Sequence, residues 1–277
     1  MTELIAKAKR LGFHGMVAQW EDYSKQPWLP SLLMLEEEER RLRSFTRRVR
    51  DAKIGQFKPL ADYDWTWPKR IDRELVEELF TFKFLTQAAN VVFMAPNGLG
   101  KTMFAQNLAY QALLAGHDAK FVKASKLLDE LSECDGAHAR RRCLRKYCGV
   151  DLLVVDEVGY MRYGDHHADL LYEVISERYQ NLSTIVTTNK PFKEWGEVFP
   201  NAACVVTLVD QLIHKAEIVV IEGDSYRQKE AKERQEAREK QRKEKPAISA
   251  SNPAAQDGKG KSGGRTCNTT AVRGGAK

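Results

Sequence analysis

The sequence lacks any hydrophobic stretch long enough to cross a membrane. Its 277 residues are 43% hydrophobic and 30% charged, yet no apolar run approaches the roughly 18 residues that a membrane helix needs. The N-terminal segment MTELIAKAKRLGF also lacks the apolar core of a signal peptide. We therefore expect a cytoplasmic protein without membrane contact, and enough apolar side chains to build a buried core.

Cysteine is scarce and follows no pattern. The five cysteines form no C-x-x-C pair, and no histidine stands at ligand spacing from them, which argues against the common zinc motifs. Five is also an odd number, so we expect reduced thiols in a reducing compartment. The five are Cys134, Cys143, Cys148, Cys204 and Cys267.

Most of the chain has no excess of positive charge. The net charge is +6, but residues 228–277 hold 13 Lys and Arg against 6 Asp and Glu, so the remainder is close to neutral. A domain that coats DNA would be basic throughout. Any contact with nucleic acid must therefore come from particular basic stripes or from this tail.

The composition changes along the chain and suggests separate parts. Residues 1–54 are rich in helix formers and predict a small all-helical N-terminal domain. Residues 55–72 predict a connector pinned to a domain surface by its aromatic rings; base stacking by Trp65 or Trp67 is the alternative. Residues 228–245 predict a helix laced with opposite charges. Residues 246–277, rich in small and polar residues, predict a disordered basic tail.

Residues 73–227 alternate between short β-branched runs and helical segments. Helices are predicted at 101–115, 125–134 and 168–181. Such alternation builds a parallel sheet with helices on both faces, so the expected fold class is α/β. The predicted strands are 90–94, 119–122, 152–155, 184–187 and 218–221.

A phosphate-binding loop is the first candidate site. The stretch MAPNGLGKT, residues 94–102, matches G-x-x-x-x-G-K-[ST] except that Ala95 replaces the first glycine. It lies between a predicted strand and a predicted helix, as the motif requires. Lys101 would reach the β- and γ-phosphates of ATP, and the Thr102 hydroxyl would bind Mg²⁺. The loop residues are Ala95, Pro96, Asn97, Gly98, Leu99, Gly100, Lys101 and Thr102.

Ala95 stands at the entrance of the loop, before the residues that wrap the phosphate. A methyl group is acceptable there if φ stays below zero, whereas a side chain at Gly98 or Gly100 would block the phosphate. We therefore predict that the chain binds ATP and Mg²⁺ without the first glycine of the motif.

Two further strand ends supply polar side chains. Asp156 and Glu157 follow the buried run LLVV; Asp156 would orient Mg²⁺, and Glu157 would polarise an attacking water, which favours hydrolysis over phosphoryl transfer to a substrate. Asn189 follows the strand 184–187 and would position that water. Because the carboxyl ends of parallel strands meet at one edge of a sheet, we expect these groups to converge on the loop.

Longer stretches resemble a known family. DLLVVDEVGY, ISERYQNLSTIVTTNKPFKEWGEVF and VIEGDSYR resemble the IstB-type ATP-binding helper proteins of insertion-sequence transposition, which are similar to DnaC-type helicase loaders. The resemblance extends over residues 1–227 and leaves out the tail. It implies an AAA+ P-loop ATPase that assembles as a homo-oligomer on double-stranded DNA and recruits the transposase of the same element.

The resemblance also implies roles at the subunit interface. Asn189 and Arg227 match the family's two γ-phosphate sensors. Where the family usually has Asp-Arg-Leu, with an arginine that acts on the neighbour's ATP, this chain has Gln211 in the middle position. Such an arginine is worth roughly 10³–10⁵ in rate in related enzymes, and glutamine carries no charge. Arg178 is one candidate substitute; a helix-surface salt bridge is the other interpretation of it.

Two basic stripes are the candidates for DNA contact, and a solvated basic helix is the alternative for each. Contact with phosphates predicts binding that is sensitive to salt and tolerant of sequence. On the first stripe's helix, an apolar stripe of Leu35, Leu42, Phe45 and Val49 runs along another face. The basic candidates are Arg40, Arg43, Arg47, Arg50, Arg140, Arg141, Arg142, Arg145 and Lys146.

Three functions therefore remain open. The first is an ATP-hydrolysing, DNA-binding transposition helper. The second is a helicase loader of the DnaC type. The third is an ATP-gated DNA-binding scaffold that hydrolyses little ATP, which the glutamine at position 211 would favour.

Overall fold

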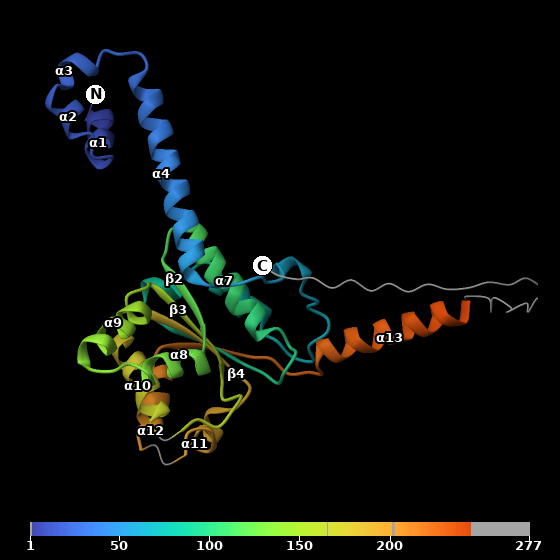
Figure 1. Cartoon of the computed structure of the whole chain (residues 1–277). Helices are drawn as coiled ribbons and strands as arrows, with labels where there is room; N and C mark the ends of the chain where they lie inside the picture. The colour runs from blue at the N-terminus through green and yellow to red at the C-terminus, as the bar shows by residue number, and fades with distance from the viewer. Residues whose placement is uncertain (1, 165, 201–202, 245–277) are drawn as a thin grey trace, which may run out of the picture. The chain divides into compact units, whose positions relative to one another are not determined.

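A computed structural model describes residues 2–164, 166–200 and 203–244 of the chain (Figure 1). Its helices are α1 (Thr2–Arg10), α2 (His14–Ala18), α3 (Trp20–Tyr23), α4 (Leu29–Ala52), α5 (Arg73–Leu79), α6 (Lys83–Thr86), α7 (Lys101–Leu114), α8 (Ala124–Ser132), α9 (Ala137–Cys148), α10 (His167–Arg178), α11 (Trp195–Val198), α12 (Val205–Ile213) and α13 (Tyr226–Glu244). Its strands are β1 (Asn90–Met94), β2 (Ala119–Lys123), β3 (Leu152–Val158), β4 (Ser183–Thr188) and β5 (Ala216–Val220). None of the helices in these ranges is long and apolar enough to span a bilayer.

The five strands form one parallel sheet in the order β2-β3-β4-β1-β5. All five predicted strands are present, with ends that differ from the prediction by a few residues. The order places β4 between β1, which leads into the phosphate-binding loop, and β3, which carries the acid pair. The carboxyl ends of these three neighbouring strands therefore meet at one edge of the sheet.

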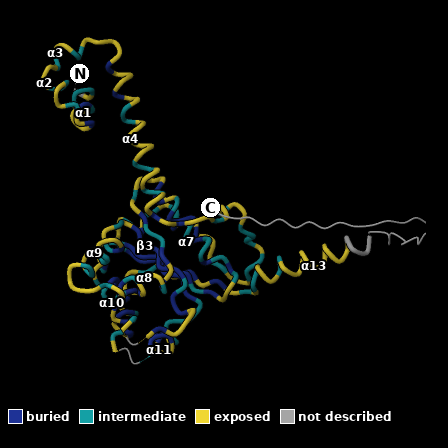
Figure 2. The backbone as a smooth tube through the Cα atoms, in the orientation of Figure 1, coloured by how far each residue is buried: buried dark blue, intermediate teal, exposed yellow. Residues whose placement is uncertain are grey.

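Successive residues of the central strands pack on opposite faces of the sheet, as the twofold period of a strand requires. On β1, Val91 and Phe93 contact a core built with α7 and α5, while Val92 contacts a second core built with α8, α10 and α12. On β3, Leu152 faces the first core and Leu153 the second. Figure 2 shows this buried sheet and the largely exposed middle of α4.

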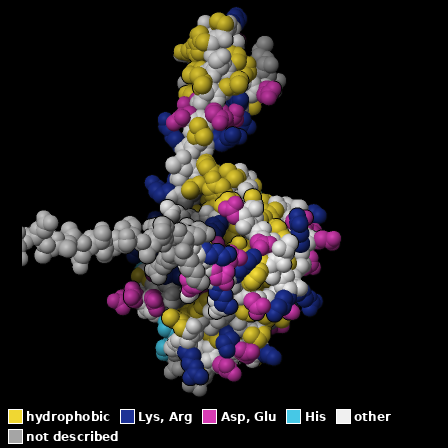
Figure 3. All heavy atoms as spheres, turned by 90° about the vertical axis from the view of Figure 1, so that its right-hand side faces the viewer, with side chains coloured by type: hydrophobic (Ala, Val, Ile, Leu, Met, Phe, Trp, Pro, Cys, Tyr) yellow, Lys and Arg dark blue, Asp and Glu magenta, His cyan; other side chains and the backbone are white. Residues whose placement is uncertain are grey.

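Helix α4 is held at its two ends. Near its start, Leu29 and Leu33 are fully buried with Ala8 and Leu11 of the first helices. Near its end, Phe45 packs against Tyr110 of α7 with ring centroids 6.4 Å apart. Hydrophobic side chains remain exposed on this part of the protein (Figure 3).

The connector between α4 and α5 lies against α7 through its aromatic rings. The ring centroids of Tyr63 and Phe104 are 4.6 Å apart, and those of Trp65 and Phe104 are 5.8 Å apart. The Asn107 side chain accepts a hydrogen bond from the Leu60 backbone N–H at 3.0 Å. These contacts favour the interpretation of residues 55–72 as a connector pinned to the domain surface. They count against the alternative, in which its rings are free to stack on the bases of a nucleic acid.

Several helices were not predicted from the sequence, among them α12. Contacts divide the chain into residues 1–232 and 233–277. The described part of the second unit continues α13, where Gln235 Nε2 donates a hydrogen bond to Glu239 Oε1 at 3.3 Å. The predicted disordered tail, 246–277, lies outside the described residues.

Candidate functional site

The loop between β1 and α7 requires glycine at two positions. Gly98 and Gly100 have φ values of 85° and 92°, which side chains of L-residues rarely adopt. A Cβ atom at Gly98 would lie 2.1 Å from Ser225 Oγ, and one at Gly100 would lie 2.7 Å from Cε2 of Tyr63. Both conformation and space therefore exclude larger residues here.

Neither restriction, a positive φ or a lack of space for a side chain, applies to Ala95. Its φ is negative, its side chain is buried, and its N–H donates a hydrogen bond to the Thr188 carbonyl of β4 at 3.2 Å. The negative φ is the condition under which a methyl group was expected to be acceptable at this position. The missing first glycine does not disturb the loop.

Lys101 begins α7 with its side chain folded into the loop. Its ammonium group donates hydrogen bonds to the carbonyls of Ala95 at 2.6 Å and Pro96 at 2.9 Å, and the residue is 3% exposed. Burial lowers the pKa of Lys101 to about 8, and nearby Asp156 opposes this effect. A buried cation with only carbonyl partners gains stabilisation from a phosphate.

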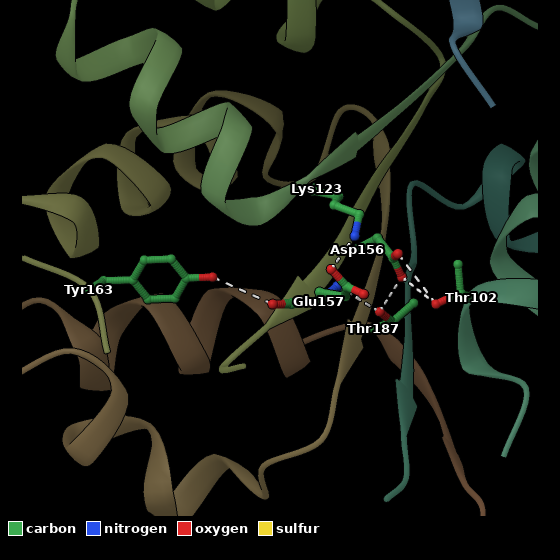
Figure 4. A network of polar contacts seen from close by, with 6 residues as sticks. All are labelled: Thr102, Lys123, Asp156, Glu157, Tyr163 and Thr187. Carbon is green, nitrogen blue, oxygen red and sulfur yellow. Dashed lines mark hydrogen bonds and ion pairs between the residues drawn. The ribbon is translucent and has the colours of Figure 1, made fainter. Parts of the chain in front are cut away.

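Asp156 is held by hydroxyl groups from two other elements (Figure 4). Thr102 Oγ1 donates a hydrogen bond to Asp156 Oδ1 at 3.0 Å, and Thr187 Oγ1 of β4 donates to the same oxygen at 2.6 Å. Burial raises the pKa of Asp156, and the two hydroxyl groups oppose this. Thr187 was not predicted as a site residue, because only the pairing of β3 with β4 brings it to the carboxylate.

Glu157 occupies a strained position at an irregularity in β3. The register with β4 shifts between Val155 and Val158, and Glu157 has a φ of 65°. Its N–H donates to Thr187 Oγ1 at 2.9 Å, and its carboxylate forms an ion pair with Lys123 Nζ at 2.7 Å. The distortion turns Glu157 to the cavity beside the loop.

A cavity of about 350 Å³ lies beside the loop, within the range of roughly 300–1,000 Å³ that small-molecule sites occupy. One part is lined by the loop and Glu157, and another by aromatic rings from the connector and α13. Trp67 is fixed there because its Nε1 donates to the Asp224 carbonyl at 2.7 Å. The aromatic lining residues are Tyr63, Trp67, Tyr160 and Tyr226.

This aromatic wall was missed as part of the site. The rings of residues 55–72 were noticed in the sequence, but they were assigned to packing or, as the alternative for Trp65 and Trp67, to base stacking, and not to the nucleotide site. Arg227, at the start of α13, lines the same cavity as Lys101 and Glu157. The segment before it is tied to the loop, since the Tyr226 N–H donates to the Gly98 carbonyl at 3.0 Å.

Neither Asn189 nor Gln211 lines the cavity. Asn189 directly follows β4, at the edge where Asp156 lies, but it is not among the residues that line the cavity. Gln211 lies on α12. The side-chain oxygens of both are buried and have no hydrogen-bond partner among the described residues.

Both interpretations of Arg178 were wrong. The residue is 1% exposed, so it is neither a surface salt bridge nor a group that can reach a neighbouring subunit. Its guanidinium donates to the carbonyls of Val150 at 2.8 Å and Ser183 at 2.6 Å, and to Thr184 Oγ1 at 3.0 Å. Burial lowers its pKa to about 10. Arg178 links α10 to the ends of β3 and β4.

The basic candidates differ in how far acidic residues neutralise them. Arg40 pairs with Glu36 at 2.5 Å and Arg43 with Glu39 at 2.7 Å; Arg50 pairs with its neighbour Asp51. On α9, Arg140 pairs with Glu173 and Lys146 with Glu130. Among the described residues, four candidates form no such ion pair: Arg47, Arg141, Arg142 and Arg145.

The residues present suit ATP and Mg²⁺. The described ranges hold no cluster of three or more His, Cys, Asp or Glu side chains able to bind a metal. A cation at Thr102 and Asp156 would therefore need phosphate or water oxygens as further ligands, which is how Mg²⁺ is usually bound beside nucleotides. The buried Lys101 and Asp156 supply the complementary charges.

The fold and site together define a P-loop ATP-binding protein, with a parallel sheet, a phosphate-binding loop after β1 and an acid pair on β3. The model of the IstB-like ATP binding protein family matches residues 6–234. The chain belongs to this family, and its function is associated with insertion sequences and with ATP.

Similar proteins carry corresponding names. A relative from Geobacillus stearothermophilus, named for ATP binding and insertion sequence IS5376, is 29% identical over 84% of this chain and 93% of its own length. One from Pseudomonas aeruginosa, named for ATP binding and IS21, is 32% identical over 69% of this chain and 72% of its own.

Solved structures give weaker likenesses. That of DnaI has a TM-score of 0.49 at 17% identity, over 62% of this chain and 92% of its own. The structure of the DnaC helicase loader has a TM-score of 0.45 at 19% identity, over 62% of this chain and 97% of its own. Likenesses at this level say nothing about activity.

Proposed function

We propose that this chain is an ATP-hydrolysing helper of insertion-sequence transposition, which assembles on double-stranded DNA and recruits or stimulates the transposase of the same element. The observation that carries the proposal is the convergence of Lys101, Thr102, Asp156 and Glu157 beside one cavity, in a chain of the IstB-like family. The family supplies the biological setting, and the site supplies the chemistry.

The proposed chemistry assigns a separate task to each group. Lys101 binds phosphate oxygens and neutralises their charge, and Thr102 and Asp156 hold Mg²⁺. When bound, Mg²⁺ withdraws charge from the phosphate oxygens. Glu157 accepts a proton from the attacking water, and Asn189 orients that water. Arg227 lines the same cavity as Glu157 and senses the γ-phosphate.

The aromatic wall gives the site its affinity for a nucleoside. Tyr63, Trp67 and Tyr226 line the cavity beside the loop, and a base gains about 1–3 kcal/mol from stacking on such a ring. We infer that the adenine lies at this wall. The connector then serves as a part of the nucleotide site as well as a spacer.

An ATP-gated scaffold with little hydrolysis is the second candidate, and two observations favour it. Gln211 cannot supply the positive charge of a trans arginine, and Arg178, the candidate substitute, is buried. Glu157 is also engaged by Lys123 at 2.7 Å, which competes with a water for its carboxylate. A helicase loader has less support, because the relatives' names refer to insertion sequences.

DNA contact is proposed at the arginines without acidic partners. On α9, three of them follow one another within a turn and a half: Arg141, Arg142 and Arg145. Since phosphate contacts release counterions, each one lost reduces the slope of log affinity against log salt by about 0.9. Arg40 and Arg43 are held by glutamates and contribute less.

Fluorescence anisotropy on duplex DNA at several salt concentrations, with and without ATP, tests this proposal. We expect ATP to strengthen binding of the natural protein and the triple alanine variant of Arg141, Arg142 and Arg145 to bind with a shallower salt slope. Lys126→Ala, at an exposed lysine on α8, is the matched control and should leave the slope unchanged. Binding that is insensitive to both ATP and salt would contradict the proposal, as would failure of the transposase to co-purify with the ATP-bound protein.

A further inference from the structure

Two neighbouring acidic residues of β3 lie opposite a single residue of β4. The pairing of the two strands is regular up to Val155 and resumes at Val158. Between these points Asp156 and Glu157 have only Thr187 as their neighbour on β4, which is the two-against-one arrangement of a β-bulge. A bulge interrupts the ladder of backbone hydrogen bonds, so the acid pair needs another support.

The Thr187 side chain supports both acidic residues at once. Its Oγ1 accepts a hydrogen bond from the Glu157 N–H at 2.9 Å. Since an N–H only donates and an ionised carboxylate only accepts, the hydroxyl proton is directed to Asp156 Oδ1, 2.6 Å away (Figure 4). Thr187 is 0% exposed, so bulk water does not compete for its hydroxyl group.

For Asp156, Thr187 is the support that does not depend on a metal ion. Thr102 Oγ1 also donates to Asp156 Oδ1, at 3.0 Å, but this hydroxyl is the one assigned to Mg²⁺. The Thr187 hydroxyl holds the same carboxylate oxygen before any cation binds. Such outer partners of a metal ligand usually change metal affinity about 10–100-fold.

For Glu157, Thr187 helps to hold a strained backbone. A φ of 65° costs free energy in an L-residue and persists only where the surroundings enforce it. Thr187 holds the Glu157 N–H, and the Glu157 carbonyl accepts a hydrogen bond from the Tyr163 hydroxyl at 3.4 Å. Loss of the Thr187 bond would allow the backbone to relax and would redirect the carboxylate away from the cavity that Glu157 lines.

We propose that Thr187 is a positioning residue for ATP hydrolysis, which holds Asp156 in place for Mg²⁺ and keeps Glu157 turned to the cavity. It does not line the cavity itself, so it acts only through these two residues. The competing explanation is that its hydroxyl merely supports the packing of β3 on β4. The inference rests on the proposed function, but the two hydrogen bonds belong to the free chain and can be tested without ATP.

Four variants separate the two explanations. Thr187→Val and Thr187→Ala remove the hydroxyl, and Thr187→Ser keeps it. Thr184→Val is the matched control, because Thr184 also lies on β4 and is 1% exposed, while its hydroxyl serves Arg178, whose Nε donates to it at 3.0 Å. The control therefore loses a buried hydroxyl from the same strand and leaves the support of the acid pair intact.

Isothermal titration with ATP, in Mg²⁺ and in a chelator, measures the effect on the metal site. In Mg²⁺ we expect Thr187→Val and Thr187→Ala to bind ATP about tenfold or more weakly, the factor for one hydrogen bond to a charged group. In the chelator their affinity should stay within a factor of about two, since Thr187 does not line the cavity. Thr187→Ser and Thr184→Val should keep the natural ratio of the two affinities.

Turnover at saturating ATP and Mg²⁺ measures the effect on Glu157. We expect a fall of about tenfold or more in Thr187→Val, because a general base that is turned away from its water loses most of its contribution. Thr187→Ser should restore most of this loss. Thr184→Val should turn over like the natural chain at a temperature where both are folded.

Amide hydrogen exchange of the free chain tests the support of Glu157 without ATP. Nitrogen-labelled glutamate gives an NMR signal for the Glu157 N–H, which is identified by its absence in Glu157→Gln. This N–H should exchange several-fold faster in Thr187→Val and Thr187→Ala than in the natural chain. Thr187→Ser and Thr184→Val should exchange it at the natural rate.

Three results would overturn this inference: Mg²⁺-dependent affinity and turnover that survive Thr187→Val, an equal loss of both in Thr184→Val, or a Glu157 N–H that exchanges at the same rate in every variant. The second result would mean that the hydroxyl only supports the strand. If the natural chain binds ATP but hydrolyses none, the proposed function is wrong and the role of Thr187 in hydrolysis falls with it, whereas the exchange rates still report whether its hydrogen bond to Glu157 exists.

Discussion

Gly98→Ala tests whether the loop depends on Gly98 and not on the glycine missing at position 95. The substitution places an L-residue at a φ of 85°, which costs about 1–2 kcal/mol, or roughly 5–30-fold in the population of the loop conformation. The new Cβ would also lie 2.1 Å from Ser225 Oγ and 3.0 Å from Ser225 Cβ. The segment before α13 must then move away from the loop.

Isothermal titration with ATP measures the effect. We expect affinity to fall by at least about tenfold in Gly98→Ala, and to stay within a factor of about two in Ala95→Gly, because Ala95 already has a negative φ. Adding Ser225→Gly to Gly98→Ala should recover part of the loss by removing the clash, while the cost of the backbone conformation remains. The reasoning is refuted if Gly98→Ala binds ATP normally, or if Ala95→Gly weakens binding as much.

Three further substitutions or conditions test the site and its support. ATP affinity should fall about tenfold between pH 7 and pH 9, because Lys101 has a pKa of about 8 in the free protein and only its protonated form attracts phosphate; a flat profile would contradict this. Lys123→Met should raise ATP turnover, by at most about fivefold, since exposed ion pairs contribute roughly 0.2–1 kcal/mol. Lys126→Met is its control, and a fall in turnover would show that Lys123 assists Glu157. Arg178→Leu should lower the free energy of unfolding by about 3–5 kcal/mol, because it leaves buried carbonyls without donors; a denaturation midpoint equal to that of the natural protein would refute this.

Local patterns were sufficient to predict the sheet and much of the site. Strands such as 90–94 appear as buried β-branched runs, and the loop motif names its own lysine and threonine. The convergence of the strand ends also follows, because a parallel sheet brings its carboxyl ends to one edge, whereas the order of the strands is known only from the structure. Lys101, Thr102 and Glu157 line one cavity, and Asp156 contacts Thr102; their roles toward ATP stay a prediction.

The remaining features depend on contacts between segments far apart in the sequence. Thr187 reads as an ordinary strand residue until β4 pairs with β3, 31 residues away from Asp156. Arg178 reads as a surface residue at the end of a helix, and only tertiary packing buries it against the carbonyls of β3 and β4. In the sequence, Trp67 is interpreted as a residue that packs the connector onto the domain. Only its contact with the segment before α13 shows that it lines the cavity.

The central claim is that this site hydrolyses ATP through Glu157. A steady-state ATPase assay with duplex DNA tests it most directly, comparing the natural protein with Glu157→Gln and Gln211→Arg. We expect measurable turnover in the natural protein, a loss of about 100-fold or more in Glu157→Gln with ATP binding retained, and a gain in Gln211→Arg, where a trans arginine is restored. Turnover that is unchanged in Glu157→Gln would contradict the account.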